Sequence, residues 1–155
     1  MEAVFRAVER GDGYVAVEKS SLVVRNLKRQ GKIDDAMFFL MNLANKLADA
    51  NLWESATVSA FRAIDLFPED ARTIKVALKK EFFEFAKRVE TPVAATHEFY
   101  SYIDQLSEKI GDLDNVLFMK KVEMAILAKQ YFNVQLFILD GILSVIDMDE
   151  PPFDV

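Results

Sequence analysis

The sequence predicts an all-α fold in which seven to eight helices stack as helical hairpins in an α-solenoid. Apolar residues recur every three or four positions, as at Leu78, Phe82 and Phe85, and nothing reads as the alternating pattern of a strand. Turn-forming residues separate these stretches. The first apolar residues after the turns recur at intervals of about 20 residues, which is typical of hairpins stacked in a line. These residues are Tyr14, Ile33, Trp53, Ile74, Val93, Leu113 and Tyr131.

Helix boundaries follow from the turns in chain order. The expected helices cover residues 2–10, 14–30, 33–49, 52–67, 70–89, 92–110 and 113–129, with an eighth from 131 to 147. The first of these is short enough to be a partial turn. Pro68 ends one helix, and Thr91 before Pro92 is typical of an N-cap followed by proline at the first helical position. Residues 1–147 are expected to form a single domain. Residues 148–155 form an acidic tail whose prolines cannot continue a helix.

One stretch resembles a tetratricopeptide unit when it is framed from Met37. Small or apolar residues stand where that motif needs two helices to pack closely, and a proline closes the unit. These residues are Leu43, Ala44, Ala56, Ala63 and Pro68. The other stretches fit a repeat of roughly 34 residues less well, so we expect a tetratricopeptide-like array and not a regular one.

Composition argues against an enzyme. The 155 residues include no cysteine and a single histidine, His97, which excludes disulfides, thiol nucleophiles and paired-histidine metal sites. Acidic pairs such as Asp34 and Asp35 fall at expected helix starts, where the helix dipole favours negative charge, so capping explains them better than cation binding. We therefore expect no catalytic residues, no cofactor and no metal.

Charge is unevenly distributed along the chain. The net charge is −6, which disfavours a nucleic-acid partner. Residues 1–32 nevertheless carry a net charge of +3, and the remainder carries −9. A basic helix face in this first part suits electrostatic attraction to a protein with an acidic patch, although a merely solvated face has the same pattern. The candidate contact residues are Arg25, Lys28 and Arg29.

Membrane insertion is not expected. The longest apolar run, residues 36–41, is far shorter than the roughly 20 residues that a membrane span requires. The start of the chain is interrupted by Glu2 and Arg6, so it does not read as a secretory signal. A chain without cysteine suits the reducing cytoplasm, which is the expected location.

The last expected helix is unusually apolar. Eleven of the 16 residues from Tyr131 to Ile146 are apolar, whereas a terminal helix of a solenoid normally has a polar outer face. We expect a second copy of the chain, a partner protein or the folded-back tail to cover it. The candidate contact residues are Tyr131, Phe132, Phe137 and Leu143.

Residues 11–66 resemble the start of an adaptor subunit of the guided entry of tail-anchored proteins pathway, and further matches in comparable order follow up to residue 112. The resemblance rests on the turn Gly11-Asp12-Gly13-Tyr14-Val15-Ala16 before a helix with Arg25 and Arg29. It continues through Lys32-Ile33-Asp34-Asp35-Ala36, Leu43-Ala44, Pro92, His97 and Gly111-Asp112. The family pattern has a second aromatic where this chain has Gly13, and the family's carboxy-terminal half has no counterpart here. The resemblance implies an α-solenoid that links a targeting ATPase to a ubiquitin-like subunit that recruits chaperones.

Two other functions fit the pattern. The segment from Leu127 to Asp140 is similar to helices in scaffold subunits of signalosome and proteasome-lid assemblies, which would dock through residues 131–146. The aromatic and methionine residues could instead line the groove of a small-molecule or lipid carrier, although aromatics at helical spacing usually belong to a core. Those residues are Met37, Phe38, Phe39, Met41, Phe82, Phe83, Phe85, Phe118 and Met119.

Overall fold

Helices make up the secondary structure of the described part of the chain. The computed structural model describes residues 1–88, 97–110, 118, 119, 122, 138 and 139. The α-helices are α1 (Glu2–Glu9), α2 (Gly13–Arg29), α3 (Ile33–Asp49), α4 (Trp53–Ile64), α5 (Val76–Arg88) and α6 (His97–Ile110), and a 3-10 turn, η1 (Ala71–Thr73), lies between α4 and α5. The prediction of an all-α chain is confirmed for these residues. The helices expected at 113–129 and 131–147, and the acidic tail, lie outside this part.

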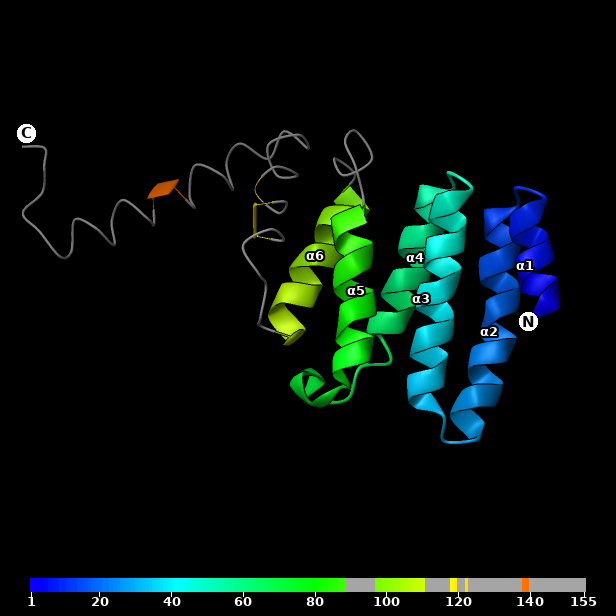
Figure 1. Cartoon of the computed structure of the whole chain (residues 1–155), viewed down its shortest axis with the longest axis horizontal. Coiled ribbons are helices and arrows are strands. Elements are labelled where there is room, and N and C mark those ends of the chain that lie inside the picture. The colour runs from blue at the N-terminus through cyan, green and yellow to red at the C-terminus, as the bar shows by residue number, and fades with distance from the viewer. Residues whose placement is uncertain (89–96, 111–117, 120–121, 123–137, 140–155) are drawn as a thin grey trace, which may run out of the picture.

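The helices lie side by side in a row from α1 to α6 (Figure 1). Helices consecutive in sequence contact each other from α1 to α4, and alternate helices also contact, as α1 with α3, α2 with α4, α3 with α5 and α4 with α6. The odd-numbered helices therefore adjoin one another, and so do the even-numbered ones. A hydrophobic core built from residues of all six helices lies between them.

Three helices end in the same kind of turn. The residue after each C-cap has a positive φ, which is 76° at Gly11, 74° at Gly31 and 61° at Asn51. At each turn the next backbone N–H donates to the carbonyl five residues earlier, and the positive-φ residue donates three residues back, as in a Schellman motif. The three positions are 20 residues apart, so the turns reproduce the period expected from the sequence.

Asn51 gives a direct test of this turn, because asparagine tolerates the left-handed region less well than glycine. We expect Asn51→Gly to raise the free energy of unfolding by about 0.5 kcal/mol and Asn51→Ala to lower it by about 1 kcal/mol. The matched control is Asn42→Ala, because Asn42 is exposed within α3, where alanine is the better helix former. Urea unfolding followed by circular dichroism measures all three variants. A stabilising Asn51→Ala would contradict the assigned backbone conformation.

The connection between α4 and α5 departs from the expected boundaries. α4 ends at Ile64 instead of residue 67, because Pro68 cannot extend it and the backbone forms turns at Leu66 and Phe67. The helix expected over 70–89 is divided into η1 and α5. The Asp70 carboxylate accepts from the backbone N–H of Arg72 at 3.1 Å, and the Thr73 hydroxyl donates to the Asp70 carbonyl at 2.7 Å. These local bonds stabilise a short turn in place of the first turn of α5.

α1 differs from the expectation of a partial turn, and α6 is described from residue 97 onward. α1 is a complete helix of eight residues, not a partial turn, because Val4, Ala7 and Val8 bury one of its faces. The helix expected at 92–110 is described from residue 97, so the cap at Thr91 and Pro92 and the side chain of His97 lie outside the described part. The described boundaries of α2 and α3 agree with the expected ones to within one residue.

Close approach of helices depends on small residues. Leu43, Ala44, Ala56 and Ala63 are fully buried, and the buried Ser59 hydroxyl of α4 donates to the Leu40 carbonyl of α3 at 2.7 Å. Gly13 lies where α2 approaches α4. A Cβ atom there would lie 2.8 Å from Ser55 Cβ and in severe contact with Ser55 Oγ. Packing of α2 against α4 therefore favours glycine at position 13.

An aromatic cluster joins α4, α5 and α6. The buried Phe85 ring lies 6.4 Å from Trp53, 6.0 Å from Phe99 and 5.5 Å from Tyr102, measured between centroids. The Tyr102 hydroxyl donates to the Phe82 carbonyl at 3.0 Å. Burial raises the pKa of Tyr102 well above its ordinary value, so this donor keeps its proton.

The residues suggested for a carrier groove fall mainly in the core. Met37, Phe39, Met41, Phe82 and Phe85 are buried, and Phe38 and Phe83 are half-buried against them, whereas Phe118 and Met119 are exposed. Phe38 and Phe39 also line a shallow pocket of about 430 Å³ with Met1, Phe5 and Glu81. The nine residues do not share one groove in the described part of the chain.

Candidate functional site

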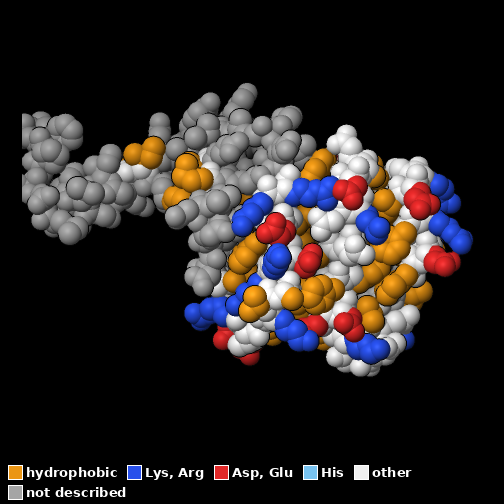
Figure 2. All heavy atoms as spheres, viewed as in Figure 1, with side chains coloured by type: hydrophobic (Ala, Val, Ile, Leu, Met, Phe, Trp, Pro, Cys, Tyr) orange, Lys and Arg blue, Asp and Glu red, His pale blue; other side chains and the backbone are white. Residues whose placement is uncertain are grey.

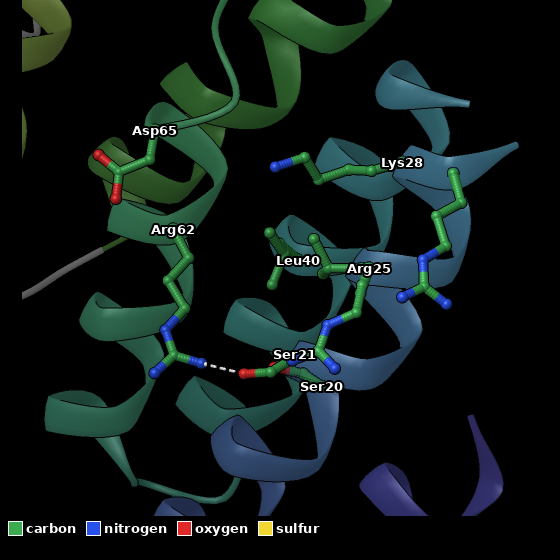
Figure 3. A pocket seen from close by; sticks show the side chains of 9 residues that line it. Ser20, Ser21, Arg25, Lys28, Leu40, Arg62 and Asp65 are labelled. Carbon is green, nitrogen blue, oxygen red and sulfur yellow. Dashed lines mark hydrogen bonds between the residues drawn. The ribbon is translucent and has the colours of Figure 1, made fainter. Parts of the chain in front are cut away.

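The three basic residues singled out in the sequence line one groove between α2 and α4. Arg25, Lys28 and Arg29 come from α2, Arg62 and Asp65 from the end of α4, and Leu40 of α3 lies between the two helices. The remaining lining residues are Ser20, Ser21 and Val24. The groove encloses about 550 Å³, and Figure 3 shows Lys28 extending from α2 toward α4.

Helical spacing places the three α2 cations together. Positions 25, 28 and 29 are related by three and four residues, so they share one side of the helix. All three are exposed, while Val24 and Leu27 are half-buried. None of the three forms an ion pair with another residue in the described part of the chain, where the described pairs involve other cations. Three like charges on one helix face without ion-pair partners favour an anionic ligand.

Arg62 adds a fourth cation from a distant part of the sequence. Its Nη1 donates to the Val17 carbonyl at 3.1 Å and to the Ser21 hydroxyl at 2.9 Å, as Figure 3 shows for Ser21. Its Nη2 lies 3.9 Å from Glu18 Oε1, and 37% of its side chain is exposed. Arg62 therefore ties α4 to α2 and contributes positive charge to the groove. Arg62 was not among the predicted contact residues, although it is the single basic residue among the mostly apolar or small residues of α4.

On the face seen in Figure 2, basic and acidic side chains are interspersed among hydrophobic ones. Four basic residues and one acidic residue, Asp65, line the groove. The fold adds the fourth cation to this set, because Arg25, Lys28 and Arg29 belong to α2 and Arg62 belongs to α4.

A second pocket of about 560 Å³ continues from the first. Lys28 and Asp65 line both. The second pocket lies against the α4–α5 connection, and half of its ten lining residues are apolar. Its ion pair joins Lys75 Nζ to Asp34 Oδ2 at 3.3 Å. The apolar lining residues are Ile33, Met37, Leu66, Pro68 and Ile74, with Thr73 beside them.

The second predicted contact surface is the apolar segment at residues 131–146. Tyr131, Phe132, Phe137 and Leu143 lie outside the described residues. The two neighbouring residues that are described, Ile138 and Leu139, are 54% and 48% exposed.

Among the described residues, no group of three or more histidine, cysteine or acidic side chains is arranged to hold a metal ion. No helix in the described part of the chain combines the length and the apolar character needed to cross a bilayer.

Comparisons of the chain with models of protein families, with curated proteins and with solved structures found no match.

Proposed function

We propose that this protein is a non-enzymatic adaptor or scaffold that binds an acidic surface of a partner protein through the groove between α2 and α4. The proposal rests on one observation. Arg25, Lys28 and Arg29 line the same groove, and none of them has an ion-pair partner among the described residues. Such a cluster raises the local potential and accelerates association with an oppositely charged partner.

The more specific form of the proposal follows the resemblance noted in the sequence. In this form the chain is a cytoplasmic adaptor in the delivery of tail-anchored membrane proteins, and a targeting ATPase presents the acidic surface. The stacked-hairpin arrangement would then serve as a rigid support. A scaffold role in a signalosome-like or lid-like assembly would instead use residues 131–146, so the two forms predict different contact residues.

Charge reversal tests the groove. The variant Arg25→Glu, Lys28→Glu, Arg29→Glu is expected to weaken partner binding by at least about 10-fold, because attraction becomes repulsion. The matched control is Arg10→Glu, Lys19→Glu, Lys32→Glu, which changes the net charge equally at exposed residues that do not line the groove. Thermal melting verifies that both variants remain folded.

Partners are first captured from the source cell lysate with the wild-type chain and both variants as bait, and are then purified for binding measurements. Partners retained by the wild type and the control but lost from the groove variant support the proposal, and a targeting ATPase among them supports the specific form. Signalosome or lid subunits captured equally by all three baits would contradict the groove and favour the apolar segment at 131–146.

A further inference from the structure

The groove has two parts of different chemistry, and the second part narrows the class of ligand. This inference rests on the proposed function. We call Arg25, Lys28, Arg29 and Arg62 the cationic half, and Ile33, Met37, Leu66, Pro68 and Ile74 the apolar half. Because Lys28 and Asp65 line both pockets, a single extended ligand can occupy the two halves together.

The apolar half offers little to a charged group. The described cation that lines only this half, Lys75, is paired with Asp34, and the Thr73 hydroxyl already donates to the Asp70 carbonyl. With Lys28 and Lys75 against Asp34 and Asp65, the lining of this second pocket has no net positive charge to attract a second anion. What remains is contact with half-buried or exposed carbon at Ile33, Leu66 and Pro68, which favours an apolar side chain.

Lys28 connects the two halves. Its side chain extends toward α4 (Figure 3), so its methylene groups can contact an apolar ligand group while its ammonium stays with the cationic half. A uniform polyanion suits only the cationic half, because the cation that lines the second pocket alone, Lys75, is already paired with Asp34.

We propose that the groove binds an extended acidic segment of a partner protein in which several carboxylates adjoin a large apolar residue. The carboxylates contact Arg25, Lys28 and Arg29, and the apolar side chain occupies the apolar half. The positive charge and the carbon-lined pocket are adjacent, so the ligand is recognised by the order of its residues as well as by its charge.

Synthetic peptides test this proposal with the full chain. One peptide carries consecutive aspartates and glutamates next to leucine and phenylalanine, and a second replaces the two apolar residues with serine. A third replaces the acids with asparagine and glutamine. Calorimetry should show the first binding about 10-fold more tightly than the second, which corresponds to about 1.4 kcal/mol for the buried apolar group. The third should bind more weakly than either, because it lacks charge.

The dependence on ionic strength separates the electrostatic contribution to peptide affinity from the apolar one. Raising the ionic strength from about 0.05 M to about 0.5 M should weaken both acidic peptides but leave the ratio of their affinities unchanged, because screening acts on charge alone. Leu66→Ala should reduce that ratio without changing the affinity of the serine peptide. As a second measurement, a benzophenone at the phenylalanine position should cross-link to residues of the apolar half.

Several results would overturn the inference. These are equal affinity of the first two peptides, cross-links outside the apolar half, or equally tight binding of polyglutamate or single-stranded RNA. If no peptide binds while partner capture still depends on Arg25, Lys28 and Arg29, this inference fails and the proposed function stands. If charge reversal also has no effect on capture, both fail.

Discussion

Phe85→Ala is expected to lower the free energy of unfolding by about 3–5 kcal/mol, the usual cost of removing a large aromatic side chain from a core. Phe85 of α5 is fully buried. Its ring lies against Trp53 of α4 and against Phe99 and Tyr102 of α6. Its removal leaves a cavity between three helices and takes away the edge-to-face contact with Tyr102.

The matched control for Phe85 is Phe83→Ala. Phe83 lies on the same helix but is only half-buried, so its truncation should cost about 1–2 kcal/mol. Urea unfolding followed by fluorescence is suitable, because the single tryptophan, Trp53, lies beside Phe85. If Phe85→Ala does not fold at all, Phe85→Leu preserves a measurable protein with a smaller loss. Equal losses at positions 83 and 85 would contradict the placement of the cluster.

Gly13→Ala is expected to destabilise the protein by about 1–3 kcal/mol, although the same change in an open helix would stabilise it. The new Cβ would lie 2.8 Å from Ser55 Cβ, an atom that no rotamer change can move away. α2 must therefore shift relative to α4, or the side chains must overlap.

A double-mutant cycle isolates the Gly13 contact. In a Ser55→Gly background both clashing atoms are absent, so Gly13→Ala should become neutral or stabilising by about 0.5 kcal/mol. The decisive observation is that Gly13→Ala lowers the free energy of unfolding in the wild-type background but does not lower it in the Ser55→Gly background. Destabilisation of the same size in both would show that the cost arises elsewhere.

The sequence predicted the helices best where local signals act alone. The bounds of α2 and α3 are set by the turns at Gly11, Gly31 and Asn51, which can be recognised without any knowledge of the fold. The expected start of α5 was wrong because Asp70 forms local hydrogen bonds that compete with the helix, a balance that periodicity does not report.

The candidate site was predicted in part. Arg25, Lys28 and Arg29 could be grouped from helical spacing, because neighbours on one helix face are fixed by sequence alone. Arg62 could not be added, since its hydrogen bond to the Val17 carbonyl spans 45 residues and depends on how α2 packs against α4. The apolar half of the groove was missed because it includes the α4–α5 connection, which the sequence analysis treated as a simple break.

The α4–α5 connection affects where along the row of helices a partner could bind. Hairpins that are joined by equivalent turns have similar surfaces. A ligand could therefore bind to such an array at several sites, in alternative registers. The three turns at Gly11, Gly31 and Asn51 follow this rule, whereas the segment from Asp65 to Lys75 breaks it and supplies Leu66, Pro68 and Ile74 to the groove. The irregular junction marks one place along the row as different from the others. A segment that binds at this junction would therefore have one position along the row of helices and no alternative register.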